Sequence, residues 1–414
     1  MSDQPGTDPA GAEQTLLVTV SGDDRPGVTS ALFDAIADVG AEVRDLEQVV
    51  VRDHLTLAML LAAGPQTDRL DEVVNLVGRS LGMTVKVRRG TGDSGSRRTG
   101  RAAVVLLGSP LRASAVAAIT ARIAGHGANI DRIRRLSRYP VTTVEFDISG
   151  AELDRLRREL ALEATIQGVD IAVAAGGLAR RGRRLVVMDV DSTLIQQEVI
   201  EMLAAHSGRE TEVRAVTERA MRGELDFAES LRQRVRALAG LDESVLDEVR
   251  RAVVLTPGAR TLVRTLKRLG FTVALVSGGF IEVVSQIAEE LGIDCAEANR
   301  LEIVDGKLTG NVLGEIVDRA GKARALRRFA AEAGLPLSRT VAIGDGANDL
   351  DMLASAGLGV AFNAKPVVRE QADTAVNVPY LDAVLYLLGI TREEVEEADA
   401  ADGTPTPAPA LPSR

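Results

Sequence analysis

Hydrophobic and polar positions follow the same order twice in residues 15 to about 175. Each copy opens with an apolar run, 16–20 or 103–107, and continues with a helix-period segment that a glycine ends, Gly40 or Gly127. Two alternating runs, an amphipathic segment and a last apolar run follow in both copies. This order predicts strand, helix, strand, strand, helix, strand, which is a ferredoxin-like βαββαβ domain in duplicate.

The pattern changes after Gly177. From Arg184 onward, short apolar strands alternate with long helix-period segments, which predicts a parallel α/β sheet. The predicted strands are 185–188, 271–276, 340–343 and 358–361, and the helices between them include 258–269, 280–291, 321–333 and 349–356. Residues from about 196 to 255 show only helix-like pattern, so we expect them to form an inserted helical cap.

Both ends of the chain have a composition that cannot bury enough apolar area to fold. The N-terminal segment is polar with Gly and Pro, and the C-terminal one runs from acidic residues into Thr-Pro-Thr-Pro-Ala-Pro-Ala. We therefore expect five segments. They are an unstructured N-terminus at 1–14, small domains at 15–95 and 101–176, an α/β domain at 184–392, and an unstructured tail at 393–414.

The composition is that of an ordinary water-soluble protein. Of the 414 residues, 45% are hydrophobic and 26% are charged, which suits two or three domains. The formal charge of -10 argues against binding along nucleic-acid phosphates, which needs clustered positive charge. Cys295 is the one cysteine, so we expect no internal disulfide, and we find neither a signal peptide nor an apolar run long enough for a membrane span. We expect a cytoplasmic protein that binds no nucleic acid and no membrane.

Chemically active side chains follow the ends of the predicted parallel strands. They are Asp189 and Asp191 after 185–188, Ser277 and Gly278 after 271–276, Asp345 to Asp349 after 340–343, and Lys322 just inside the helix that begins at Gly321. The carboxyl ends of parallel strands share one edge of a sheet, so we expect these residues to meet. Carboxylates hold Mg²⁺ through hard oxygen ligands, and the metal, a lysine and Ser-Gly amides together neutralise phosphate oxygens. The joint set predicts Mg²⁺-dependent phosphoryl transfer, although each motif alone also occurs as an ordinary loop or surface position.

This ordered set resembles the haloacid dehalogenase superfamily in its phosphatase branch. The resemblance implies that Asp189 is the nucleophile that forms an aspartyl-phosphate. It implies that Asp191 is the general acid that protonates the leaving alcohol and then accepts a proton from water. Ser277 and Lys322 are expected to hold the transferring phosphoryl group.

The same resemblance implies a Mg²⁺ site. Asp345 is expected to bind the metal, together with Asp189 and the main-chain carbonyl of Asp191. Asp349 is expected to support the water molecules on the metal rather than to bind the ion.

Several segments resemble the phosphoserine phosphatase family in particular. They are 189–198 (Asp-Val-Asp-Ser-Thr-Leu-Ile-Gln-Gln-Glu), Met221 with Phe227, 230–235, 276–280, 298–301 and 344–349. The resemblance implies that Glu198 meets the substrate ammonium and Arg234 its carboxylate, as an amino acid zwitterion requires. It implies that Asn348 contacts the phosphate or hydroxyl side, and that Met221 and Phe227 wall the cap pocket. Without the resemblance, Glu198 is equally an acid in a first helical turn and Arg234 a solvated cap residue.

Residues 15 to about 175 resemble two tandem ACT domains, modules that commonly bind amino acids and pair through their sheets. The segment Asp24-Arg25-Pro26-Gly27 follows the first strand as in many such domains, and only the first copy has it. A serine effector is therefore expected near Asp24, Gly27 and Asn129, and open sheet edges favour a homodimer. The alternative is a turn in which Asp24 simply caps the first helix.

The expected function is Mg²⁺-dependent hydrolysis of O-phospho-L-serine to L-serine and phosphate, the last step of serine biosynthesis in the pathway that the family serves. Serine is expected to regulate it at the ACT domains. Two alternatives stay open at this point. One is a phosphatase or phosphotransferase that acts on another phosphomonoester. The other is a non-catalytic, amino-acid-sensing regulatory protein, which the complete set of acidic, hydroxyl and lysine positions disfavours.

Overall fold

The computed structural model of the chain describes residues 14–62, 64–91, 100–138, 140–176, 182, 184–221, 224–404 and 406–407, with the backbone alone at 91, 218, 220 and 221. The chain divides into two compact units, residues 1–97 and 98–414. The predictions for residues 1–13 and 408–414 lie outside the described residues.

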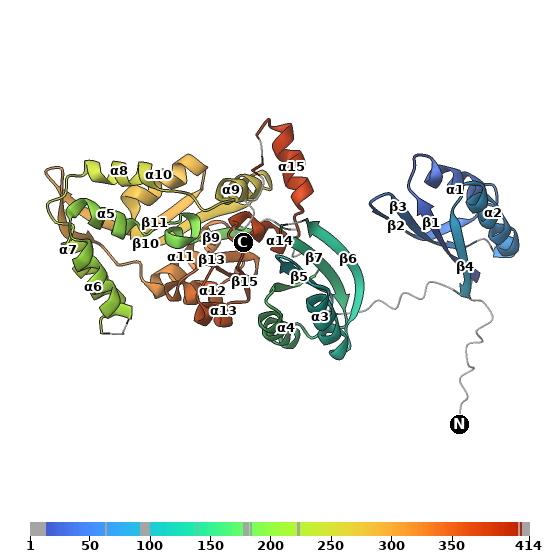
Figure 1. Ribbon diagram of the computed structural model, residues 1–414, viewed down its shortest axis with the longest axis horizontal. Helices are drawn as coiled ribbons and strands as arrows, with labels where there is room; N and C mark the ends of the chain where they lie inside the picture. Colours follow the sequence, from blue (N-terminus) through green and yellow to red (C-terminus); the bar gives the residue numbers. More distant parts are fainter. Residues whose placement is uncertain are drawn as a thin grey trace, which may run out of the picture. The chain divides into compact units, whose positions relative to one another are not determined.

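The first unit is one βαββαβ domain. β1 (Gln14–Asp23), β2 (Glu42–Val51), β3 (His54–Ala62) and β4 (Thr84–Thr91) form an antiparallel sheet in the order β2-β3-β1-β4. α1 (Val28–Ala37) and α2 (Thr67–Ser80) pack on one face of it (Figure 1). Successive strand residues point to opposite faces, so Leu16, Val18 and Val20 of β1 enter the core while Leu17 stays exposed.

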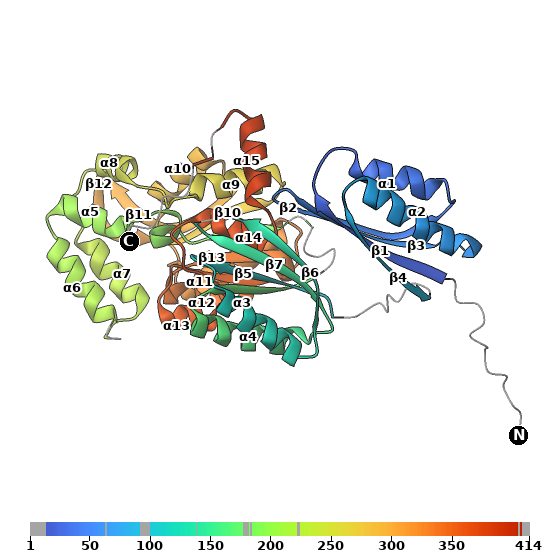
Figure 2. The same ribbon diagram turned by 45° about the vertical axis from the view of Figure 1, so that its right-hand side comes forward.

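The second unit begins with another domain of the same plan. β5 (Ala102–Gly108), β6 (Asn129–Ser137), β7 (Thr142–Ser149) and β8 (Asp170–Ala175) form a sheet in the order β6-β7-β5-β8, with α3 (Ala113–Gly125) and α4 (Leu153–Gln167) on one face (Figure 2). Two ferredoxin-like domains are therefore confirmed. All seven residues of β5 are buried, which requires a cover on the second face of this sheet as well.

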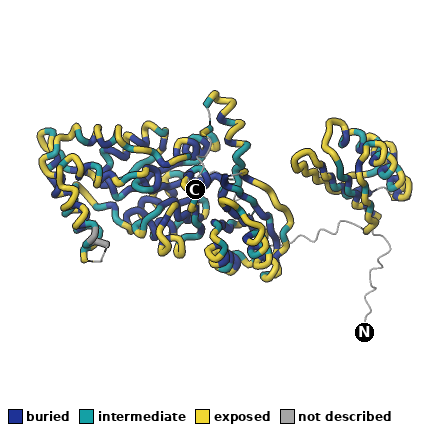
Figure 3. The backbone as a smooth tube through the Cα atoms, viewed as in Figure 1, coloured by how far each residue is buried: buried dark blue, intermediate teal, exposed yellow. Residues whose placement is uncertain are grey.

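The α/β domain supplies that cover. Its sheet has seven strands in the order β12-β11-β10-β9-β13-β14-β15, parallel except for β12. The strands are β9 (Leu185–Met188), β10 (Thr272–Phe280), β11 (Cys295–Val304), β12 (Lys307–Leu313), β13 (Thr340–Gly344), β14 (Leu358–Phe362) and β15 (Thr374–Val376). The prediction of a parallel α/β sheet is confirmed, and the four predicted strands correspond to β9, β10, β13 and β14. Nearly all residues of β9, β10, β13 and β14 are buried (Figure 3).

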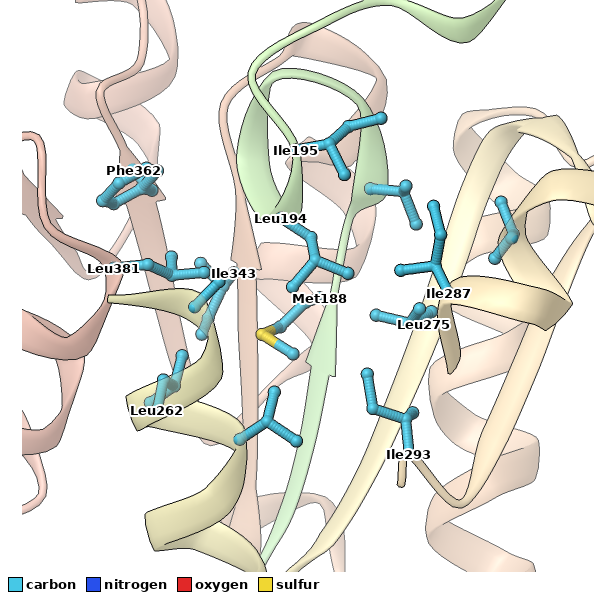
Figure 4. Packing of buried hydrophobic residues seen from close by; sticks show 14 of the residues in the cluster. Met188, Leu194, Ile195, Leu262, Leu275, Ile287, Ile293, Ile343, Phe362 and Leu381 are labelled. Carbon is cyan, nitrogen blue, oxygen red and sulfur yellow. The ribbon is translucent and has the colours of Figure 1, made fainter. Parts of the chain in front are cut away.

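Helices cover both faces of this sheet. On one side lie α9 (Ala259–Arg268), α10 (Ile281–Leu291) and α14 (Val384–Leu387), and on the other lie α11 (Arg319–Glu332), α12 (Leu350–Ser355) and α13 (Pro366–Gln371). Met188, Leu275 and Ile343 come from neighbouring strands and pack together on the first side (Figure 4). Four further helices form the cap between β9 and α9: α5 (Val199–Ser207), α6 (Glu210–Met221), α7 (Phe227–Arg236) and α8 (Ser244–Ala252). No helix in the described part of the chain is both long and apolar enough to cross a membrane.

The second ACT-like domain is built into the core of the α/β domain. Leu107 and Leu136 belong to the same buried apolar cluster as Met188. A hydrogen bond also joins the two domains. The carboxylate of Asp170, the first residue of β8, accepts from the backbone N–H of Asn377, which follows β15, at 2.7 Å. Burial raises the pKa of Asp170, but both of its oxygens have partners on Asn377. The two folds therefore share one apolar interior.

The prediction that the tail lacks structure is wrong for residues 393–401. They belong to α15 (Arg392–Ala401), which Thr391 and Glu394 begin with a reciprocal capping box. The Asp399 carboxylate of this helix is fully buried and accepts hydrogen bonds from Arg264 and Arg268 of α9. These arginines lie about 130 residues away along the chain. Amino-acid composition does not reveal these arginine partners, because a prediction of disorder assumes that acidic residues stay in water.

Candidate active site

The carboxyl ends of three adjacent strands carry the predicted catalytic side chains. β9 lies between β10 and β13, so Asp189 after β9 stands beside Ser277 in β10 and Asp345 after β13. Lys322 reaches the same point from the first turn of α11. The structure thus brings together Asp189, Ser277, Lys322 and Asp345, which belong to the set that the sequence predicts to meet.

Lys322 lies at the centre of this cluster and has no exposed surface. Its Nζ is 2.7 Å from the Asp189 carboxylate and 2.6 Å from that of Asp349. Burial alone lowers the pKa of the lysine, but the two neighbouring carboxylates raise it by more, so its pKa lies above the ordinary value. Burial, and then the charge of Asp349, raise the pKa of Asp189. Lys322 is therefore a fixed cation between two buried acids.

Three carboxylates can hold a divalent cation here. One oxygen from each of Asp189, Asp345 and Asp349 lies within 4.8 Å of the others. Burial, and then the charge of Asp349, raise the pKa of Asp345 to about 6, although the charge of Lys322 opposes the rise. Carboxylate oxygens are the ligands that hard divalent cations prefer. Both oxygens of Asp349 already have partners, Lys322 and the backbone N–H of Gly346, which fits a supporting position better than a ligand.

Asp191 links the strand edge to the cap. One of its oxygens accepts a 2.8 Å hydrogen bond from the backbone N–H of Val199, the first residue of α5. The other accepts a 3.0 Å hydrogen bond from the Ser277 hydroxyl. Burial raises the pKa of this carboxyl group. Asp191 therefore lies where the segment that begins at Ser277 meets the cap.

Little space is left around the two glycines that follow Ser277. A Cβ on Gly278 would lie 3.0 Å from the Phe227 ring of α7, and one on Gly279 would lie 2.8 Å from the Asp191 carboxylate. Phe227, predicted to wall the cap pocket, thus contacts the loop directly. The backbone N–H of Gly279 donates to the Ser277 hydroxyl oxygen at 2.8 Å.

Glu198 and Arg234 extend the site into the cap. Ser192 holds Glu198 by donating its hydroxyl to the carboxylate at 2.8 Å, and its own backbone is left-handed, with φ of 56°. Burial, and then the charge of Asp191, raise the pKa of Glu198 to about 7. Burial lowers the pKa of Arg234, and the charge of Glu198 is the largest effect that opposes it. Glu198, which keeps exposed surface, and the partly buried Arg234 therefore place one acidic and one cationic group near the same acids.

Asn348 and Met221 are the remaining residues that the sequence predicts for the substrate site. Asn348 lies in the turn after β13, and its amide oxygen folds back over Gly346. The side chain of Met221 lies outside the described residues. Sequence reasoning assigned no role to Thr193, whose hydroxyl lies 3.2 Å from Asp345, although Thr193 falls inside the quoted 189–198 segment.

The expected effector residues fall in both units. Asp24 is exposed, and the alternative that it caps α1 is wrong, because the N-cap is Gly27 with φ of 94° and no side chain accepts a hydrogen bond there. Asn129 is exposed at the start of β6 and donates to Asp131 at 2.7 Å. The Asp24 carboxylate therefore does not cap α1.

Comparison with known proteins agrees with this architecture. Residues 186–354 match the family of haloacid dehalogenase-like hydrolases, and residues 14–88 and 101–174 each match an ACT-domain family. The chain is thus a haloacid dehalogenase-like hydrolase that carries two ACT domains.

Full-length relatives narrow the assignment. The chain is 63% identical to the phosphoserine phosphatase of Streptomyces coelicolor over 387 residues, which cover 93% of this chain and 94% of that one. It is 50% identical to a phosphoserine phosphatase of Mycobacterium tuberculosis over 397 residues, 94% of this chain and 97% of the relative. A crystal structure of a probable phosphoserine phosphatase from Vibrio cholerae matches 69% of this chain and 86% of its own, with 37% identity and a TM-score of 0.56. The chain belongs to the phosphoserine phosphatase family, as the sequence motifs indicate.

Proposed function

We propose that this chain hydrolyses O-phospho-L-serine to L-serine and inorganic phosphate, as the last step of serine biosynthesis in the cytoplasm, and that it requires Mg²⁺. The observation that carries the proposal is the meeting of Asp189, Ser277 and Lys322 at one strand edge, under a cap that presents Glu198 and Arg234. A Mg²⁺ ion held by Asp189, Asp345 and the main-chain carbonyl of Asp191 would offset the charge of the phosphoryl oxygens, with Asp349 in support.

The proposed reaction consists of two successive displacements at phosphorus. An Asp189 oxygen attacks phosphorus, the bond from phosphorus to the serine oxygen breaks, and Asp191 gives its proton to that oxygen. Water then attacks the phosphorus of the aspartyl-phosphate and passes a proton to Asp191, and the bond to Asp189 breaks. Ser277, the amide of Gly278 and Lys322 hold the phosphoryl group through both steps.

The cap would select the amino acid part of the substrate. Glu198 pairs with the ammonium and Arg234 with the carboxylate, while Phe227 and Met221 wall the pocket and Asn348 contacts the phosphate or hydroxyl side. Release of phosphate from a panel of phosphomonoesters, with Mg²⁺ or with a chelator, tests the proposal. Preference for phosphoserine and loss of activity on chelation are expected. Phosphate transfer to a second alcohol in place of release would instead favour a phosphotransferase.

The pH dependence of substrate binding follows from the raised pKa of Glu198. Only the ionised carboxylate binds an ammonium, so KM for phosphoserine should rise as pH falls below about 7, by up to about tenfold per pH unit. The bound ammonium lowers this pKa, so kcat should change less over the same range. Initial rates between about pH 6 and 8, at saturating Mg²⁺, measure both constants. Glu198→Gln should show a high KM that no longer varies with pH, and a pH-independent KM in the unaltered protein would contradict the assignment.

We further propose that serine acts on the first ACT domain and that the chain forms a homodimer. β2 is an edge strand of its sheet, and all of its residues are exposed (Figure 3). Val43, Leu46 and Val50 are among its exposed apolar residues. An exposed apolar edge strand is suited to pairing with a second copy.

A titration of the full chain with L-serine tests this regulation. Serine should lower the rate, and at about 100 times its Kd it should add about 2.7 kcal/mol to the free energy of unfolding, seen as a higher Tm. Asp24→Ala should remove the response, whereas Asp38→Ala, a matched exposed change at the other end of α1, should keep it. Unchanged rate, assembly state and Tm in the presence of serine would refute the effector role.

A further inference from the structure

β10 leaves its regular pairing where it enters the active site. The ladder with β11 pairs Val276 with Glu297 and next pairs Phe280 with Asn299. Three residues of β10, Ser277 to Gly279, therefore lie opposite a single residue of β11. Such a bulge leaves backbone groups without ladder partners, and buried backbone groups need partners from elsewhere.

The Asn299 side chain supplies a partner for one backbone group of the bulge and also binds the segment before α11. Its Nδ2 donates to the carbonyl oxygen of Gly278 at 2.8 Å, and its Oδ1 accepts from the backbone N–H of Val317 at 2.8 Å. Only 1% of Asn299 is exposed, so water does not replace either bond. Val317 immediately precedes Asp318, which caps α11 by accepting from Gly321. One amide thus joins the bulge to the start of the helix that carries Lys322.

The bond to Gly278 also orients the groups that face the substrate. In a planar trans peptide the carbonyl and the N–H point in opposite directions, so fixing the Gly278 carbonyl fixes the Gly279 N–H. That N–H donates to the Ser277 hydroxyl oxygen, and the hydroxyl donates to Asp191. A series of hydrogen bonds therefore runs from Val317, next to the N-cap of α11, through Asn299 and the bulge to Asp191.

We propose that Asn299 is a positioning residue for the phosphoryl group, which sets the Ser277 loop and the Lys322 helix at the correct separation. The inference rests on the proposed function, because it assigns those two elements to the phosphoryl group. Asn299 touches neither substrate nor metal in this scheme. Its effect reaches the reaction only through the backbone that it holds.

Asn299→Asp tests the hydrogen bond that the Asn299 amide donates to the Gly278 carbonyl. The carboxylate keeps an acceptor for Val317 but places an oxygen against the Gly278 carbonyl, so the loop should move while the α11 contact remains. We expect kcat to fall about 10- to 100-fold, the cost of small misplacements at a reacting centre, with a smaller change in KM. Calorimetric binding of inorganic phosphate in the presence of Mg²⁺ should weaken about tenfold, which is about 1.4 kcal/mol. The loss on p-nitrophenyl phosphate should match that on phosphoserine, because both present the same phosphoryl group.

Matched controls separate positioning from stability. Asn311→Asp changes an exposed asparagine on the adjacent strand β12 and should leave all these constants unaltered. Tm is measured for each variant, and Asn299→Ser, a smaller neutral change, is used if the aspartate variant does not fold. A folded Asn299 variant with unchanged kcat and phosphate affinity overturns the proposal, and so does failure of both variants to fold, which would make the role purely structural. If the unaltered protein hydrolyses no phosphomonoester, the proposed function fails, while phosphate binding still reports on Asn299.

Discussion

Asp189→Asn will lower kcat for phosphoserine by about 10,000-fold or more and leave the fold intact. Asparagine has nearly the same shape, but its amide cannot attack phosphorus to form an acyl phosphate. The asparagine carbonyl can still accept the 2.7 Å hydrogen bond from the backbone of Val190. The variant loses the charge that pairs with Lys322, but Lys322 keeps Asp349 as its counter-charge at 2.6 Å, and the repulsion between Asp189 and Asp349 is relieved, so Tm should change little. Phosphate release and thermal unfolding measure the two effects.

Asp191→Asn is the matched variant for this experiment. Acetyl phosphate carries a leaving group that needs no protonation, so the Asp191 variant should still become phosphorylated but should lose the base for hydrolysis. Intact-mass measurement after acid quenching should then show one added phosphoryl group in the Asp191 variant and none in the Asp189 variant. Substantial turnover by Asp189→Asn, after mass spectrometry has excluded reversion to aspartate, would show that another group is the nucleophile.

Lys322→Met will have the second large effect, on both activity and stability. Methionine fills similar volume but leaves Asp189 and Asp349 buried without the cation that lies 2.7 and 2.6 Å from them. Breaking a buried ion pair by removing one partner costs about 3 to 5 kcal/mol, and kcat should fall at least about 1,000-fold with the loss of a phosphoryl contact. Denaturant unfolding and phosphate release measure these losses.

A double variant separates the two roles of this lysine. Adding Asp349→Asn to Lys322→Met removes one of the two stranded negative charges, so part of the lost stability should return. Activity should not return, because the phosphoryl group still lacks its cation. If the single variant is as stable as the unaltered protein, the cluster is not held by Lys322 as its geometry indicates.

Much of the α/β domain could be predicted because local pattern and global arrangement agree there. Apolar runs such as 185–188 and 340–343 can be buried on both faces only as central parallel strands. Residues at the carboxyl ends of such strands must then converge, which is why Asp189 and Asp345 could be paired without coordinates. The two ACT domains could also be predicted from local pattern, because both copies have the same order of strands and helices.

Other features depend on partners that are distant along the chain. Asp399 lies in an acidic, proline-rich tail, yet two arginines of α9 hold it buried. Asp170 pairs with Asn377, and this contact joins the second ACT domain to the catalytic sheet. No local pattern encodes either pairing, because the energy of each depends on desolvation by segments that the chain brings together only on folding.

The linear order of residues was enough to establish which chemistry the chain carries and on which kind of sheet, because strand period, turn residues and carboxylate placement are local properties. The tertiary structure determines the distances, burial and hydrogen bonds on which this chemistry depends. It buried Lys322 between two acids, raised the pKa of Glu198 to about 7, and let Asn299 tie the loop of β10 to α11. Each of these depends on exclusion of water and on backbone positions from separate strands, so each exists only once the sheet, helices and cap have closed around the site.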